Sequence, residues 1–157
     1  MKGDAKVIEH LNKVLANELV AINQYFLHAK ILEDWGFEKL AKKERQESIE
    51  EMQHADELID RILRMDGLPN LQNMGKLLVG EDVPEIIACD LEQEMIAIPL
   101  LREAAALCEE QKDFVSGDLV QKILLNEEEH VAWLETQESL INDLGVQNYL
   151  QLQSSVS

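Results

Sequence analysis

The sequence predicts an all-α fold: a four-helix bundle with one long crossover and a short fifth helix at the C-terminal end. Three observations support this prediction. Apolar residues recur every three or four positions over four long segments. Only 3 Pro and 7 Gly interrupt the 157 residues. The link between the second and third segments is much longer than the other links, which is typical of bundles with a crossover.

The first two helices have clear ends. The first is expected over residues 4–34, and Trp35-Gly36 should end it. The second is expected over residues 37–65, with Gly67 as its C-cap glycine and a proline two residues further on. The apolar stripe of the first helix follows helical spacing at Ile8, Leu11, Leu15, Ile22 and Phe26.

The second half of the chain repeats this hairpin after a link over residues 68–83. The third helix is expected over residues 84–112, with Asp82 as its N-cap and a kink at Pro99. The remaining helices are expected over residues 114–143, ended by a glycine, and 147–153. Short links make antiparallel pairs, whereas the long link can cross the bundle and set the third helix parallel to the second. We expect a single domain over residues 1–157.

Composition narrows the possible functions. Apolar residues make up 46 % of the chain and charged residues 29 %, as in soluble globular proteins. The net charge of -17 argues against nucleic-acid binding and suits a protein that attracts cations. The N-terminus lacks an apolar signal core, and the longest apolar run, residues 95–101, is too short to span a membrane. We therefore expect a cytoplasmic protein. Cys89 and Cys108 should be reduced thiols on a helix.

Two Glu-x-x-His steps carry the chemistry: Glu51 with His54, and Glu127 with His130. Residues three apart share a helix face, so each step directs a carboxylate and an imidazole to the same side. Together with one Glu from each of the other helices, here Glu18 and Glu94, they match the ligand set of a di-iron or di-manganese carboxylate bundle. All lie on apolar stripes, where an unpaired carboxylate is costly. Carboxylate and imidazole ligands suit iron and manganese.

Four aromatic and histidine positions allow more than one interpretation. Tyr25 lies seven residues from Glu18 and so on the same face, where it could donate a hydrogen bond, supply an electron or only pack in the core. Trp133 is more typical of packing than of redox chemistry. His10 and His28 have no Glu at metal-binding spacing on the inner stripe, and we expect both to be surface or hydrogen-bonded core residues.

Met52 points about 100° away from Glu51 around the helix, off the inner stripe. Its expected flank contains Ser48, Ala55 and Ile59, and an apolar flank of this kind suggests a subunit contact.

Over nearly its whole length the sequence resembles the bacterioferritins. The segments that carry the resemblance are residues 1–4, 11–12, 17–28, 47–49, 51–52, 54–56, 67–72, 133–136 and 147–151. The resemblance implies a ferritin-like four-helix bundle and an iron-storage protein with ferroxidase activity. Glu18 and His54 would bind one iron, Glu94 and His130 the other, and Glu51 and Glu127 would bridge them.

The resemblance further implies a haem b shared between two subunits, with Met52 as its axial ligand. Twenty-four subunits would form a shell that stores ferric mineral, with Asn148 and Gln151 lining a four-fold pore. A bacterioferritin-associated ferredoxin would reduce the haem and release iron. It would dock near Leu68, Glu81 and Glu85.

The chain departs from the family at Arg45, Gln46 and Glu50, where many members have tyrosine, histidine and aspartate facing the shell interior. This puts an auxiliary iron site in doubt. The main alternative function is a di-iron or di-manganese oxidase or peroxidase that stores nothing. A DNA-protecting mini-ferritin conflicts with the acidic charge, and a non-catalytic haem or shell subunit conflicts with the complete ligand set.

Overall fold

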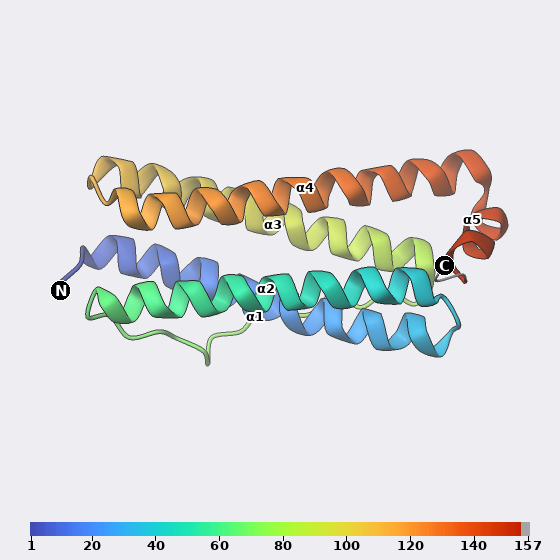
Figure 1. The fold of residues 1–157 in the computed structure, drawn as a ribbon, viewed down its shortest axis with the longest axis horizontal. Coiled ribbons are helices and arrows are strands. Elements are labelled where there is room, and N and C mark those ends of the chain that lie inside the picture. Colours follow the sequence, from blue (N-terminus) through green and yellow to red (C-terminus); the bar gives the residue numbers. More distant parts are fainter. Residues whose placement is uncertain (155–157) are drawn as a thin grey trace.

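The computed structural model describes residues 1–154, which form four long helices and one short helix (Figure 1). The all-α prediction is confirmed, and each helix begins and ends within one helical turn of its predicted position. The last three residues of the predicted 1–157 domain lie outside the described residues. The helices are α1 (Ala5–Asp34), α2 (Glu38–Arg64), α3 (Val83–Glu110), α4 (Phe114–Leu144) and α5 (Val146–Gln153).

Three aspartates cap the N-termini of long helices. Asp4 accepts hydrogen bonds from the backbone N–H groups of Lys6 and Val7. Asp82 accepts one from Glu85 N–H at 2.9 Å, as the sequence predicts. Asp113 accepts one from Ser116 N–H at 3.0 Å. Each bond satisfies an N–H group that the first turn of a helix leaves without a partner, and each is worth about 1 kcal/mol.

The end of α2 differs from the prediction. The residue with a left-handed backbone is Asp66, with φ of 61°, and not Gly67. The N–H of Gly67 donates to the carbonyl of Ile62, which closes the last turn. Glycine is required here for another reason, since a Cβ at Gly67 would lie 2.8 Å from Cγ2 of Ile8 on α1. The glycine therefore permits close packing of the chain against α1.

Two antiparallel hairpins, α1–α2 and α3–α4, lie side by side along the bundle (Figure 1). The segment between α2 and α3 runs back along the full length of the first hairpin, so that α2 and α3 point in the same direction. This confirms the predicted crossover. α3 continues as one helix through Pro99. The short α5 packs across one end of the bundle, against α4 and α2.

The core has two apolar clusters separated by a polar layer. One cluster lies towards the N-terminal end of α1 and includes Leu11, Leu15 and Leu58. The other lies towards its C-terminal end and includes Leu32, Ile87 and Leu134. Burying each such side chain contributes about 1.5–3 kcal/mol, which offsets the cost of the charged groups between them. Both cysteines are free thiols on α3, as predicted.

Within residues 1–154, none of the helices combines the length and apolar character needed to cross a membrane.

Candidate metal centre

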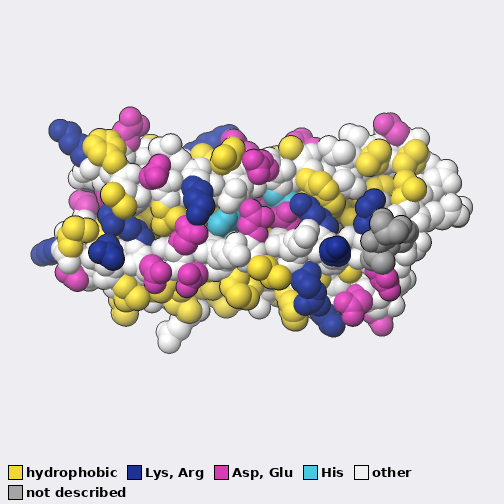
Figure 2. All heavy atoms as spheres, viewed as in Figure 1, with side chains coloured by type: hydrophobic (Ala, Val, Ile, Leu, Met, Phe, Trp, Pro, Cys, Tyr) yellow, Lys and Arg dark blue, Asp and Glu magenta, His cyan; other side chains and the backbone are white. Residues whose placement is uncertain are grey.

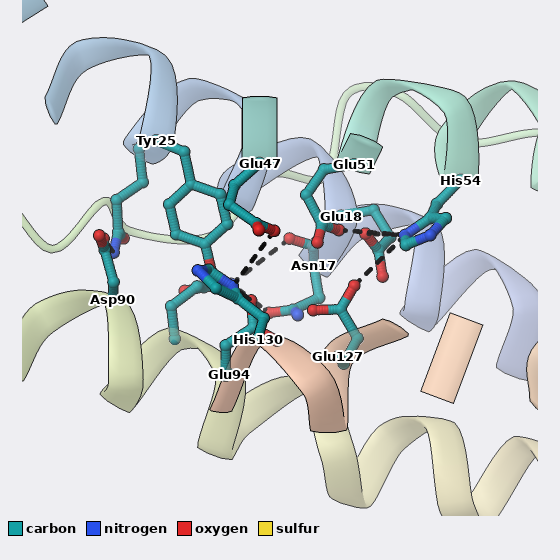
Figure 3. A network of polar contacts seen from close by, with 12 residues as sticks. Asn17, Glu18, Tyr25, Glu47, Glu51, His54, Asp90, Glu94, Glu127 and His130 are labelled. Atoms are coloured by element: carbon teal, nitrogen blue, oxygen red, sulfur yellow. Dashed lines mark hydrogen bonds and ion pairs between the residues drawn. The ribbon is translucent and has the colours of Figure 1, made fainter. Parts of the chain in front are cut away.

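The polar layer contains the six side chains predicted from the sequence, and the four long helices supply them (Figure 3). All six are buried, because each lies on the inward stripe of its helix and the apolar clusters close the layer from both ends. They are Glu18 from α1, Glu51 and His54 from α2, Glu94 from α3, and Glu127 and His130 from α4.

The first group forms around His54. Its Nδ1 atom lies 3.5 Å from Oε2 of Glu18, 3.4 Å from Oε2 of Glu51 and 3.3 Å from Oε1 of Glu127. These four residues could hold a metal ion between them. The Glu51–His54 step therefore places its two side chains as the helical spacing predicts.

The second group forms around His130, with Glu94 and Glu127, and could also hold a metal ion. The Nδ1 atom of His130 lies 3.2 Å from Oε1 of Glu94. Glu127 belongs to both groups, whereas Glu51 belongs only to the first. Glu47 also approaches, with Oε2 3.6 Å from Nδ1 of His130. Sequence reasoning gave Glu47 no role, although its position one turn before Glu51 places both on one face.

Several atoms of these residues lack a hydrogen-bond partner despite being buried. They are one carboxylate oxygen each of Glu18, Glu51, Glu94 and Glu127, together with Nδ1 of His54. A buried polar atom without a partner is costly, so such atoms are rare in folded proteins. Four ionised carboxylates also carry the charge that two divalent cations neutralise. The donor set therefore fits two divalent cations.

Without metal, these groups retain protons. Burial and the negative charge of Glu51 raise the pKa of Glu127 to about 8. Burial and Glu127 raise the pKa of Glu94 well above its ordinary value. Burial lowers the pKa of His54, but the nearby carboxylates of Glu127 and Glu51 outweigh burial and raise the pKa to about 10. Because metal ligands must be deprotonated, cations must displace these protons on binding.

Two aromatic side chains flank His130. Tyr25 is buried, its hydroxyl donates a hydrogen bond to Oε1 of Glu94, and its ring packs edge-on against His130 at 5.2 Å. Burial and the nearby carboxylates raise the pKa of Tyr25, so its hydroxyl stays protonated. Trp133 also stacks on His130, with the two ring centroids 6.2 Å apart, and the ammonium group of Lys43 lies 5.0 Å from the Trp133 ring centroid.

A second buried cluster is formed by His28, Glu44 and Asp90. It could not be predicted, because no two of its members share a helix and so no Glu-x-x-His spacing marks it. His28 was expected to be either a surface residue or a hydrogen-bonded core residue, and it is the latter. Its Nε2 accepts from Gly80 N–H at 3.1 Å, so Nδ1 carries the proton and donates to Asp90 Oδ1 at 2.8 Å. Gln24 donates to the same oxygen and accepts from Leu78 N–H. Both nitrogens of His28 are therefore occupied without a metal.

Glu44 is the unusual member of this cluster, because it is only 2 % exposed and neither carboxylate oxygen has a hydrogen-bond partner. Burial and the charge of Asp90 raise the pKa of Glu44 well above its ordinary value. The folded protein therefore holds a proton that the unfolded chain releases above about pH 4.3. This makes stability fall as pH rises through the interval between the unfolded and folded pKa values.

We expect Glu44→Gln, which is neutral at every pH, to remove this part of the pH dependence. The melting temperature of the metal-free variant should match that of the parent near pH 4.5 and exceed it by pH 8. Each unit of the pKa increase corresponds to about 1.4 kcal/mol, or about 3–6 °C in a domain of this size. Calorimetry across this pH range measures the difference, with Glu50→Gln as the control. A difference that does not change with pH would contradict the prediction.

The outer face of α2 differs in part from the prediction. Met52 is 55 % exposed, as expected for a residue off the inner stripe. Two residues of its expected flank are not beside it on the surface. Ala55 is buried, and Ser48 is buried with its hydroxyl donating to the carbonyl of Ile22. The reason is that α1 packs closely against α2 and covers this part of the α2 flank.

A groove of about 380 Å³ lies between α2 and α4, and we call it the α2–α4 groove. Histidine atoms are visible from this side of the molecule (Figure 2). Gln46 and Glu50 line the groove, as their helical spacing predicts, but Arg45 does not. Its guanidinium group lies 5.9 Å from the ring of Phe26 on α1. The groove residues are Lys43, Gln46, Glu47, Ile49, Glu50, Gln53, His54, Glu57, Lys122 and Asn126.

A bundle with a crossover and two linked carboxylate–histidine groups defines the class of ferritin-like proteins. Comparison with known proteins agrees: residues 8–144 match the model of the ferritin-like domain. Bacterioferritins of Rhodobacter capsulatus and Brucella melitensis are 50 % and 47 % identical, and each alignment covers 99 % of this chain and 96 % of the relative. A bacterial ferritin of Synechocystis is 45 % identical over its whole length. The chain belongs to the bacterioferritin family.

Proposed function

We propose that the buried layer is a di-iron ferroxidase centre. It serves iron storage, the function of the bacterioferritin family to which this chain belongs. The observation that carries the proposal is the sharing of Glu127 by two buried groups whose ligand atoms lack other partners. Glu18 and His54 hold one iron, Glu94 and His130 hold the other, and Glu127 and Glu51 bridge them. The substrates are Fe(II) and oxygen or peroxide.

The residues contribute binding, orientation and proton transfer. Two bound irons supply the redox chemistry that passes electrons from Fe(II) to oxygen or peroxide. Tyr25 fixes Glu94 through its hydroxyl and lies close enough to His130 to supply an electron. Glu47 lies beside His130 and on the wall of the α2–α4 groove, and its other oxygen pairs with Lys43. The apolar clusters exclude bulk water from both ends.

Met52 is proposed as the axial ligand of a haem b shared by two subunits. The thioether lies on the surface and is exposed, so a second copy of the chain can bring its own Met52 to the same haem. Ile49 on the same helix and Phe26 on α1 are also exposed and apolar. Hydrophobic side chains gather over this edge of the bundle (Figure 2). These features support a two-fold contact here.

The proposed assembly is a cytoplasmic shell of 24 single-domain subunits. Asn148 on α5 is exposed, which suits a pore lined by it and Gln151. A bacterioferritin-associated ferredoxin is the proposed reductant, docking near Leu68, Glu81 and Glu85. Leu68 is 83 % exposed, and a solvent-exposed leucine of this kind suits a partner contact.

Anaerobic Fe(II) addition followed by oxygen tests the function. We expect metal analysis to give two irons per subunit in the centre, then further iron retained by a particle that elutes as a shell. Light scattering measures the particle and an absorption spectrum measures oxidation and haem. A small oligomer that oxidises Fe(II) and retains none would favour the alternative, an oxidase or peroxidase that stores nothing.

The α2–α4 groove gives a prediction about an auxiliary iron. Lys43 pairs with Glu47 at 2.8 Å and Lys122 with Glu57 at 3.0 Å, which leaves Glu50 as the free carboxylate beside Gln46. An amide oxygen is a weaker ligand for Fe(II) than imidazole. A crystal soaked in Fe(II) and measured at the iron absorption edge should show two peaks between Glu51 and Glu127 and none beside Gln46.

Gln46→His should create a third peak, since it supplies an imidazole one turn from Glu50. A well-occupied third peak in the parent protein would contradict the prediction.

A further inference from the structure

The contact between Asn126 and His54 joins the metal centre to the α2–α4 groove. The side-chain amide of Asn126 lies 2.9 Å from Nε2 of His54, on the side of the ring opposite the carboxylates. Asn126 immediately precedes Glu127 on α4 and is half-buried. Both Asn126 and His54 line the groove. His54 is therefore held between carboxylates at one ring nitrogen and an amide at the other.

The chemistry of imidazole decides which amide atom faces Nε2. The Nδ1 atom of His54 points at three carboxylates, so it is the nitrogen that can bind a metal. A neutral imidazole that binds through Nδ1 carries its proton on Nε2. This N–H needs an acceptor, and the side-chain carbonyl of Asn126 supplies one when the amide is oriented with its oxygen towards His54. The nitrogen and oxygen of an amide exchange places by rotation alone.

The other half of the centre is different. Within the described part of the chain, His130 makes its hydrogen bond and ion pairs through Nδ1 only. Its ring is held by packing against Tyr25 and Trp133 instead. Hydrogen bonding thus orients one histidine and aromatic packing orients the other, so removing the amide should affect only one of the two metal positions.

The 2.9 Å contact places Nδ2 of Asn126 against Nε2, and a half-turn of the amide brings Oδ1 to the same position. We propose that Asn126 is a positioning residue for the metal centre, whose side-chain carbonyl in this turned orientation accepts the Nε2 proton of His54 and directs Nδ1 at the carboxylates. The inference rests on the proposed di-iron function. Outer partners of metal-binding histidines fix the ring and raise its basicity, and their loss typically lowers metal affinity about 10–100-fold. The groove makes this partner accessible from the side where Lys122 and Glu57 form their ion pair.

Anaerobic titration of the metal-free assembled protein with Co(II), followed by visible absorption, tests the proposal. The parent should bind two Co(II) per subunit. Asn126→Leu has a similar volume and no acceptor, so one of the two ions should bind about 10–100-fold more weakly, with a changed Co(II) band. Asn126→Asp keeps an acceptor oxygen and should retain the affinity of the parent or exceed it. Gln53→Leu, in the same groove, is the control and should match the parent.

Each outcome is decisive. Equal affinities and spectra for the parent and Asn126→Leu would overturn the role of Asn126 and leave the di-iron proposal intact. Weak binding by Asn126→Asp would also overturn the role, because its acceptor is present. A parent that binds no Co(II) would overturn both proposals. Melting temperatures of the metal-free variants identify a folding defect, and Asn126→Ala, which cannot overfill the groove, then repeats the measurement.

Discussion

Replacing Glu127 with alanine is expected to lower the rate of rapid Fe(II) oxidation by more than about 100-fold. Loss of a residue that only hydrogen-bonds to a metal ligand costs up to about 100-fold, and loss of a ligand should cost more. Glu127 is the residue that both carboxylate–histidine groups share, so its loss leaves two metal positions short of a ligand. The assembly should persist, because the side chain is buried inside the bundle and contacts no outer surface.

Stopped-flow absorption measures the oxidation rate, and light scattering measures the assembly. Glu128→Ala is a matched control, since Glu128 is the next residue on α4 but is exposed and pairs with Arg102 at 3.5 Å. Its rate should equal that of the parent. An unchanged rate in Glu127→Ala would show that the two groups do not work as one centre.

Met52→Leu is expected to abolish haem binding. Leucine keeps the apolar volume and lacks the thioether sulfur that is proposed to bind the haem iron. The ratio of haem to protein absorbance should fall to background, while Fe(II) uptake stays nearly normal because Met52 points away from the metal centre. Reductive release of stored iron should slow. Met95→Leu is the control, because Met95 is exposed to a similar extent on α3.

A full haem content in Met52→Leu, with an unchanged spectrum, would remove Met52 from the proposed haem site. Loss of haem in the Met95 variant as well would point to a general effect of losing a surface methionine.

Most of the fold could be predicted from the sequence, because local signals set the ends of the helices. Gly36 and Gly145 have φ of 90° and 81°, where other residues are strained, and they end α1 and α4. The length of the crossover determines the direction of α3. The end of α2 could not be predicted in detail, since the glycine at 67 is required by packing against Ile8 and not by its own backbone.

The six side chains of the candidate metal centre could be predicted because helical spacing alone places them on inward stripes. Contacts that depend on how helices rotate and cross could not. Glu47 reaches His130 from another helix. Arg45 turns to the ring of Phe26. Glu44 meets Asp90 across the bundle. No spacing within one helix encodes these pairs.

The crossover is anchored to the bundle by hydrogen bonds, and these also fix the axial register of the two hairpins. The N–H groups of Leu78 and Gly80 donate to Gln24 and His28 on α1, and both side chains bond to Asp90 on α3. Apolar stripes alone tolerate sliding, since a shift of one turn, about 5.4 Å, brings another leucine to a similar place. A slip of that size would break all of these bonds. This network of hydrogen bonds therefore keeps Glu18 and Glu51 at the same height along the bundle axis as Glu94 and Glu127.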